Sequence, residues 1–167
     1  MGSFRNAFIL ALIMLNVGCD QISKTIVRKE VEPGELINLI SKHITLTKVE
    51  NIGAFLSVGS SLPSFVRFIV LVFLPLIFLI YGFVLIVNRK NMPNLSVLGW
   101  CFVIGGGIGN LYDRIIHGSV TDFLHLDLIV FQTGIFNLAD VSIMTGMLII
   151  LSSLFIERST KGPAELV

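Results

Sequence analysis

Residues 68–87 form an unbroken run of 20 residues without a charged side chain. Because a helix rises about 1.5 Å per residue, a run of about this length crosses the hydrocarbon core of a bilayer. Residues 95–112 form a second uncharged run, and Pro75 inside the first is expected to kink its helix. Two further segments, 7–27 and 136–156, reach this length only by including charged residues. The sequence therefore predicts an all-α membrane protein with four transmembrane helices in these ranges.

The composition supports this class and argues against others. Hydrophobic residues make up 54% of the 167 residues, and the mean hydropathy is +0.88, well above that of soluble domains. The net charge is +1 and the chain has no basic cluster, so we expect no nucleic-acid partner. Cys19 and Cys101 lie far apart in apolar stretches, and we interpret both as reduced packing residues.

Two long connections, residues 28–64 and 113–135, fall on one side of the membrane, because an even number of spans places both termini on the other side. Within the first connection, residues 44–48 alternate between apolar or long side chains and threonines, a pattern typical of a strand. The second contains a hydrophobic stretch, residues 123–131, that we expect to be half-immersed in the membrane. We therefore predict a small extracytoplasmic β-sheet cradle on the outer face.

Basic residues predict the orientation of the chain. Those in the short segments are Arg5, Arg89, Lys90, Arg158 and Lys161, and those in the long connections are Arg28, Lys29, Lys42, Lys48 and Arg114. The two counts are equal, but the density is higher in the short segments. We therefore expect both termini in the cytoplasm.

The N-terminus also resembles the signal of a bacterial lipoprotein. Arg5 and an apolar run precede Val17-Gly18-Cys19, as in such signals. Asn16 stands where these signals usually have leucine, and further hydrophobic spans follow. We therefore interpret this segment as the first transmembrane helix.

Polar residues beside the apolar segments are the candidate functional residues, because a carboxylate near hydrocarbon usually faces a polar pocket or a partner. Asp122 and Asp140 are the candidate catalytic pair. Residues three or four positions apart share a helix face, and the faces predicted in this way are Asp20 with Lys24, Asn110 with Asp113 and Arg114, and Asn137 with Asp140. Taken singly, each face has a structural explanation. Asp20 and Lys24 fit an interfacial ion pair, Asp113 and Arg114 fit a pair at a helix end, and Asn137 fits an N-cap. Their common position at the outer ends of different spans favours one shared site.

The glycine run Gly105-Gly106-Gly107 with Gly109 is typical of closely packed membrane helices. The close packing it allows could lie within one bundle or between two copies. Because a four-span bundle with its own pocket needs no partner, we expect a monomer.

The polar residues belong to motifs spread from Asp20 to Asp140. In chain order these are Asp20-Gln21-x-Ser23-Lys24, Asn51-x-Gly53-Ala54-Phe55, Gly106-Gly107-x-Gly109-Asn110-x-x-Asp113-Arg114, Val120-x-Asp122-Phe123 and Phe136-Asn137-x-Ala139-Asp140. In order and spacing they resemble the motif set of the bacterial lipoprotein signal peptidases, also called signal peptidase II. The resemblance covers nearly the whole chain apart from the two tails. One departure is Ile108, where many members have a smaller residue, and it bears only on local packing.

The resemblance implies a four-helix aspartyl endopeptidase of the bacterial inner membrane, with its active site near the outer face. Residues 1–167 are then expected to form a single integral membrane peptidase domain. Such enzymes cut the signal peptide from prolipoproteins just before a cysteine that carries a diacylglyceryl group. By motif position, Asp122 and Asp140 become the catalytic dyad. The positions implied to bind substrate or support the site are Asn51, Gly53, Asn110, Arg114, Asn137 and Ala139, and those implied as structural polar support are Asp20, Lys24 and Asp113.

The chemistry of neighbouring carboxylates agrees with this implication. Two carboxylates a few ångströms apart share a proton and titrate as a coupled pair, which supplies one general base and one general acid. No metal or other cofactor is expected, because His43, His117 and His125 show no paired spacing with a carboxylate or cysteine. We interpret these histidines as interfacial or loop residues.

The expected partners are diacylglyceryl-modified prolipoproteins and membrane lipid. Burial of the two acyl chains between the spans would contribute roughly 0.8 kcal/mol per CH₂. Two alternatives remain at this stage. A small transporter would need a polar path to the inner side, which the cytoplasmic halves of these spans hardly offer. A structural assembly factor would tolerate Asp122→Asn and Asp140→Asn.

Overall fold

The computed structural model describes residues 2–40, 43–54, 59–128 and 131–160. Within these ranges, four helical segments are long and apolar enough to cross a membrane, as predicted. In chain order the helices are α1 (Gly2–Glu30), the continuous α2 (Ser64–Phe68), η2 (Ile69–Phe73) and α3 (Leu74–Asn88), then α4 (Asn94–Ile116) and α5 (Leu138–Thr160). Among the residues discussed above, Lys42, Phe55, Ile129, Val130 and Lys161 lie outside the described residues.

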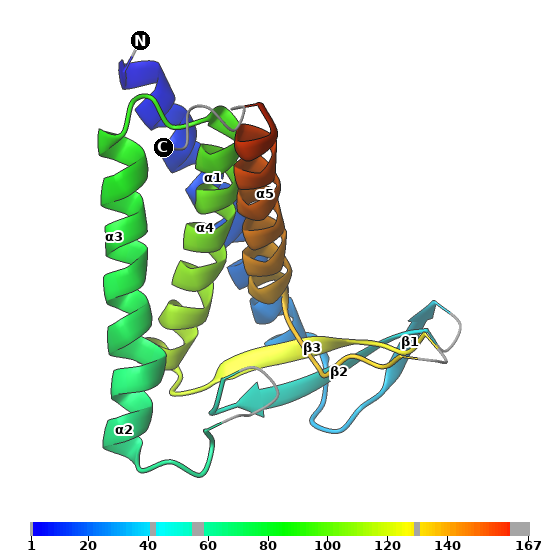
Figure 1. The fold of residues 1–167 in the computed structure, drawn as a ribbon. Helices are drawn as coiled ribbons and strands as arrows, with labels where there is room; N and C mark the ends of the chain where they lie inside the picture. The colour runs from blue at the N-terminus through cyan, green and yellow to red at the C-terminus, as the bar shows by residue number, and fades with distance from the viewer. Residues whose placement is uncertain (1, 41–42, 55–58, 129–130, 161–167) are drawn as a thin grey trace.

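Helix α4 is the most buried of the four spans and packs against α1, α3 and α5. Its glycines allow these contacts. A β-carbon at Gly105 would meet Asn16 of α1, one at Gly106 would meet Ala139 of α5, and one at Gly107 would meet Leu79 of α3. The glycine run therefore packs three neighbouring helices within one bundle (Figure 1).

Pro75 is accommodated by a π-helical turn. Residues 69–73 form this turn directly before the proline, and the backbone N–H of Leu74 donates to the carbonyl of Ile69, five residues earlier. Proline has no N–H to donate, and its ring would clash with the carbonyl four residues before it in an α-helix. The wider turn lets one membrane span continue through Pro75.

A three-stranded antiparallel sheet projects sideways from the end of the bundle opposite the N-terminus (Figure 1). Its strands are β1 (Ile37–Ile40), β2 (Ile44–Asn51) and β3 (Val120–Leu126), in that order across the sheet. This confirms the predicted small sheet. Part of the hydrophobic stretch 123–131 belongs to β3, where its backbone pairs with β2.

The sheet is fixed to the end of α1 by both apolar and polar contacts. Val27 and Val31 pack against Phe123 of β3. Beside them, Arg28 donates to the hydroxyl of Thr121 over 2.7 Å, and this hydroxyl donates to Glu50 over 2.8 Å. The root of the sheet therefore cannot shift without breaking contacts to the bundle.

The observed helix ends matter for the site. Helix α4 continues to Ile116, so Asp113 and Arg114 lie on the helix and not in the following connection. Helix α5 begins at Leu138, later than the predicted start at residue 136, because the backbone of Phe136 is bonded to Phe123 and Leu124 of β3. This pairing brings the start of α5 next to β3.

Candidate active site

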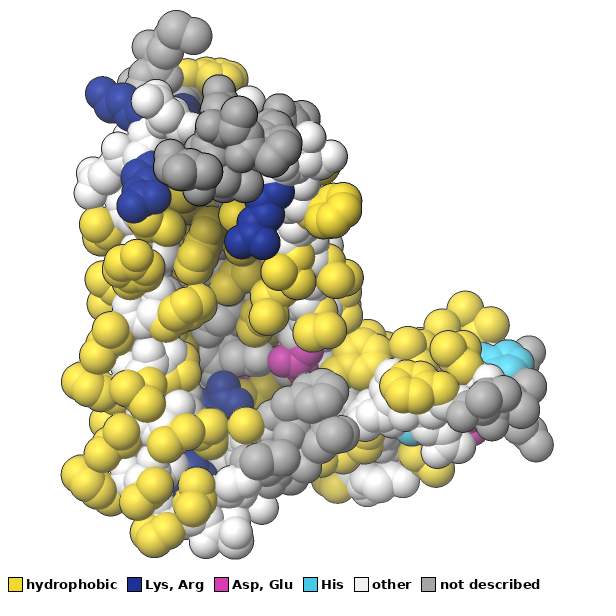
Figure 2. All heavy atoms as spheres, viewed as in Figure 1, with side chains coloured by type: hydrophobic (Ala, Val, Ile, Leu, Met, Phe, Trp, Pro, Cys, Tyr) yellow, Lys and Arg dark blue, Asp and Glu magenta, His cyan; other side chains and the backbone are white. Residues whose placement is uncertain are grey.

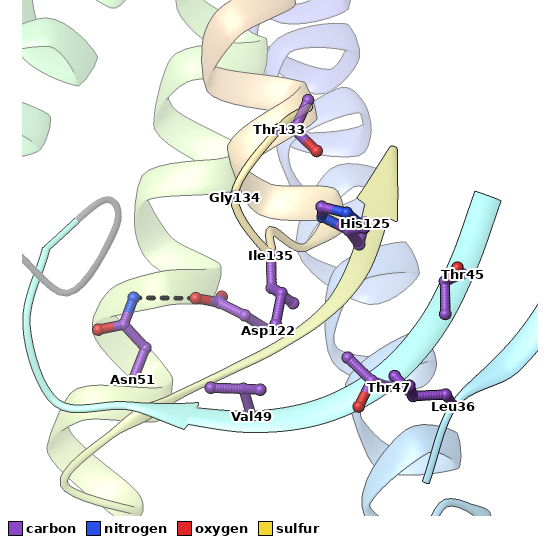
Figure 3. A pocket seen from close by; sticks show the side chains of 10 residues that line it. All are labelled: Leu36, Thr45, Thr47, Val49, Asn51, Asp122, His125, Thr133, Gly134 and Ile135. Atoms are coloured by element: carbon purple, nitrogen blue, oxygen red, sulfur yellow. Dashed lines mark hydrogen bonds between the residues drawn. The ribbon is translucent and has the colours of Figure 1, made fainter. Parts of the chain in front are cut away.

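Asp122 lies in β3, opposite Val49 of β2, and its side chain is only 4% exposed. The register of the two strands shifts between Leu46 and Val49, and irregularities of this kind re-aim side chains next to active sites. One carboxylate oxygen of Asp122 accepts a hydrogen bond from the Asn51 amide over 2.9 Å (Figure 3), and the other accepts one from the Asn137 amide over 2.6 Å. Each oxygen of this carboxylate therefore has its own amide donor.

Asp140 lies in the first turn of α5 and is held by a reciprocal capping arrangement. Its backbone N–H donates to the Asn137 side chain over 3.0 Å, and the backbone N–H of Asn137 donates to its carboxylate over 3.2 Å. The other carboxylate oxygen accepts a bond from the Asn110 amide over 2.9 Å. Asn137 is thus the predicted N-cap, and it also contacts both candidate acids.

A buried charge cluster lies on the bundle side of these residues. The Lys24 ammonium is fully buried and lies 2.8 Å from Asp20, 2.9 Å from the Asn110 amide oxygen and 3.0 Å from Asp113. Arg28 lies 2.8 Å from Asp113. The two cations and two carboxylates balance each other, which is the condition under which buried charges are tolerated.

The cluster changes two of the structural interpretations. Asp20 and Lys24 do pair, but the pair is buried and not interfacial. Asp113 pairs with Lys24 and Arg28 of α1 and not with its neighbour Arg114. No sequence motif marks Arg28 as a site residue, although it lies four residues after Lys24 on the same helix face, because it falls beyond the predicted end of the first span.

Asn110 links the charge cluster to the two candidate acids. Its amide oxygen accepts from Lys24 over 2.9 Å and from the Asn137 amide over 3.3 Å, while its amide nitrogen donates to Asp140. Because an amide has one acceptor end and one donor end, a cation at the oxygen determines that the nitrogen faces the carboxylate. Lys24 thereby sets the orientation of both asparagine amides.

Arg114 and Ala139 tie the remaining segments to the site. Arg114 donates to the carbonyl of Gly53 over 3.0 Å, in the turn where Asn51 accepts from the Gly53 N–H and donates to the Ala54 carbonyl. The backbone N–H of Ala139 donates to Asp20 over 2.9 Å. All the predicted site residues therefore meet at one place, at the junction of the sheet and the bundle.

The environment of Asp122 changes its proton affinity. Burial, together with the charge of Asp140, raises the pKa of Asp122 to about 6, although the hydrogen bonds from Asn51 and Asn137 favour the ionised form. A carboxyl group with a pKa near 6 exchanges protons close to neutral pH. It is therefore suited to general acid and base chemistry.

A pocket of about 460 Å³ opens along the sheet from Asp122 (Figure 3). Its lining consists of Leu36, Thr45, Thr47, Val49, Asn51, Asp122, His125, Thr133, Gly134 and Ile135. His125 lies on β3 opposite Thr45, so it is a strand residue beside the site and not a loop residue.

Among the described residues, no group of His, Cys, Asp and Glu side chains is arranged to hold a metal ion.

Comparisons with known proteins agree with this geometry. A family model described as signal peptidase (SPase) II matches residues 12–156. The chain is 30% identical to a lipoprotein signal peptidase of Streptococcus pneumoniae, over 92% of this chain and 96% of that protein. It is 36% identical to a lipoprotein signal peptidase of Brevibacillus brevis, over 84% of this chain and 90% of that protein.

Solved structures show that the fold is shared. One bacterial membrane enzyme, 22% identical, superposes with a TM-score of 0.84 over 96% of this chain and 95% of that chain. A second, 24% identical, gives a TM-score of 0.76 over 89% of this chain and 92% of that chain. With the family match spanning nearly the whole bundle, the chain belongs to the signal peptidase II family, the bacterial membrane proteases that process lipoproteins.

Proposed function

We propose that Asp122 and Asp140 form the catalytic pair of this membrane protease, which cleaves the signal peptide from prolipoproteins. The observation that carries the proposal is the position of Asn137. Its side-chain nitrogen donates to Asp122, while its side-chain oxygen and backbone N–H engage Asp140. One residue therefore holds both acids, as a shared reaction centre requires.

The pair would act on a water molecule placed between the carboxyl groups and the scissile peptide. The ionised carboxylate takes a proton from the water as its oxygen attacks the carbonyl carbon, and the protonated carboxyl donates its proton to the carbonyl oxygen. The tetrahedral intermediate then collapses and the C–N bond breaks. The leaving nitrogen takes the proton that came from water, and one hydroxyl of the intermediate returns its proton to the other carboxylate as the new carbonyl forms. The pair ends with one proton, as it began.

The surrounding polar residues would position this pair. Asn110 and Asn137 give each carboxylate one oriented amide donor, and Lys24 orients both amides without touching either acid. Arg114 would hold the turn at Gly53, and through it the Asn51 amide that donates to Asp122. Lys24 and Arg114 are thus positioning residues in this scheme.

The pocket beside Asp122 suits an extended polypeptide. Thr45 and Thr47 bring hydroxyl groups to its wall, and Leu36 and Ile135 offer apolar contacts. The acyl chains of a lipid-modified cysteine would lie against the apolar bundle surface, where their burial stabilises the complex. Such a substrate would be cut just before its lipidated cysteine.

We also infer that the termini lie in the cytoplasm and that the site lies near the outer membrane face. Arg5 lies near the start of α1, and Arg89 and Lys90 lie in the turn between α3 and α4, which is at the end of the bundle opposite the sheet (Figure 1). This agrees with the positive-inside rule. The glycine contacts of α4 are made within one chain, which supports a monomer.

The test is a gel-shift cleavage assay with a diacylglyceryl-modified prolipoprotein, in detergent or lipid mesophase. We expect Asp122→Asn and Asp140→Asn each to abolish the cleaved product while helicity and melting remain close to wild type. Asp127→Asn is the matched control, because this carboxylate bonds Gln132 in the loop after β3 and lies outside the proposed site. Cleavage by either site variant at the wild-type rate would remove that aspartate from the mechanism.

A further inference from the structure

A second cavity lies at the end of the bundle that carries the N-terminus, away from the sheet and the acids. It has a volume of about 940 Å³ and is formed by the start of α1, the end of α3 and the start of α4. Its lining includes Phe4, Arg5, Phe8, Lys90, Asn94 and Leu95. Nothing in the proposed peptidase chemistry uses this groove.

Most of the groove is hydrocarbon. Phe4 is 83% exposed and Phe8 is 53% exposed on the side of α1 that faces the groove, and Leu95 of α4 adds a further exposed apolar side chain. Such a surface on a membrane span is suited to an acyl chain. An apolar surface alone would accept the chains of any lipid, so the polar end of the groove decides what it selects.

The polar end of the groove is cationic. Arg5 reaches from α1 to the turn between α3 and α4, where its guanidinium donates to the carbonyl of Arg89 over 3.2 Å, and Lys90 lies exposed beside it. Within the described ranges, neither Arg5 nor Lys90 forms an ion pair with a carboxylate. Figure 2 shows Lys and Arg side chains gathered at this end, next to hydrophobic ones.

The start of α4 adds to this positive potential. The helix begins at Asn94 after Pro93, and no side chain caps its first backbone N–H groups. Free N–H groups at a helix N-terminus favour a negative charge. Asn94 itself lines the groove, so these donors lie on the same side as the two cations.

We propose that this groove binds an anionic diacyl phospholipid, with the phosphate beside Arg5 and Lys90 and an acyl chain along Phe4, Phe8 and Leu95. Basic pockets between membrane helices bind anionic headgroups in this way. Among the residues that the structure describes, the lining contains two cations and no carboxylate, so a net negative headgroup is preferred over a zwitterionic one. The site is independent of the proposed catalytic pair.

Native mass spectrometry of the full-length protein in detergent tests the proposal. The probes are phosphatidylglycerol and phosphatidylcholine with identical acyl chains, together with inorganic phosphate. We expect wild type to retain phosphatidylglycerol in preference to phosphatidylcholine, and inorganic phosphate to leave no adduct because it brings no acyl chain. Affinity for phosphatidylglycerol should fall roughly fivefold for each cation removed in Arg5→Gln and Lys90→Gln.

Lys29→Gln is the matched control, because it removes an exposed cation from the opposite end of α1. It should keep the wild-type preference. Lys90→Gln alone serves as the second variant, since its exposed side chain leaves the fold undisturbed even where Arg5→Gln alters the contact with Arg89. Equal binding of both lipids by wild type, an unchanged preference in Lys90→Gln, or a protein dimer without lipid adducts would each overturn the proposal.

Discussion

Lys24 donates to the amide oxygen of Asn110 over 2.9 Å, and this bond determines that the amide nitrogen of Asn110 faces Asp140. Without a cation at the oxygen, the amide is free to turn and present its acceptor end to the carboxylate. In the proposed mechanism, the ion cluster therefore affects the reaction as well as the fold. Two variants separate these effects.

Lys24→Met alone leaves Asp20 and Asp113 short of one positive charge, and we expect a loss of roughly 3–5 kcal/mol in folding stability. In the double variant Lys24→Met with Asp20→Asn, Asp113 keeps Arg28 and the charges balance again. The double variant should fold but turn over roughly 100-fold more slowly, with KM little changed, because the pair is mispositioned. A wild-type kcat and pH profile in the folded double variant would show that Lys24 acts on stability alone.

Asn137 allows capping and catalysis to be separated. Asn137→Ser keeps a side-chain oxygen that caps α5, but it removes the amide that donates to Asp122. We expect near-native melting and at least tenfold lower cleavage for this variant. Asn137→Ala should lose the same activity and, in addition, about 1 kcal/mol of stability. Circular dichroism melting and the gel-shift assay give the two readouts, and full activity of Asn137→Ser would contradict the shared-residue mechanism.

The raised pKa of Asp122 predicts a dependence of stability on pH. Because burial raises this pKa from 3.8 to about 6, the folded state holds the proton more tightly than the unfolded state. The proton on Asp122 therefore contributes about 3 kcal/mol to folding stability. This contribution is complete below pH 4 and is lost as the pH rises to 6. Asp122→Asn has no such proton, so its stability relative to wild type should rise between pH 4 and 6 and then level off. Parallel melting curves for the two proteins across this range would contradict the assignment.

Recognition of the acyl chains predicts a strong preference for lipidated substrates. The same prolipoprotein without its diacylglyceryl group should be cut with a much lower kcat/KM, and activity should rise with acyl length at roughly 0.8 kcal/mol per buried CH₂ until the chains leave the protein surface. Rates measured on a series of acyl lengths in one detergent check this. Equal cleavage of lipidated and non-lipidated peptides would exclude acyl recognition.

Because α4 and α5 approach each other closely, replacing a glycine at their contact by alanine should destabilise the protein. A β-carbon at Gly99 would lie 2.7 Å from the carbonyl oxygen of Gly146, so Gly99→Ala should destabilise the protein by about 1–3 kcal/mol. Gly18→Ala is the control, because a β-carbon there meets nothing within 4 Å and alanine favours the helix. Thermal unfolding in one detergent should move in opposite directions for the two variants.

The apolar runs predicted the four spans, because the bilayer requires a minimum length of uncharged helix. The motif spacing also predicted which polar residues meet. Local sequence patterns could not predict which individual side chains pair when the two residues lie on different helices or strands. Arg28 pairs with Asp113 of another helix, and His125 enters the pocket on a strand whose pairing depends on β2. The late start of α5 likewise follows from the bonds of Phe136 to β3, which no helical periodicity reveals.

The two proposed catalytic acids come from different parts of the chain, Asp122 from the projecting sheet and Asp140 from the last helix. Because Asn137 joins them only after α5 has docked, the nascent chain holds no assembled reaction centre while its earlier segments enter the bilayer. If the pair is catalytic as proposed, an inserted fragment that lacks α5 should therefore cleave no substrate.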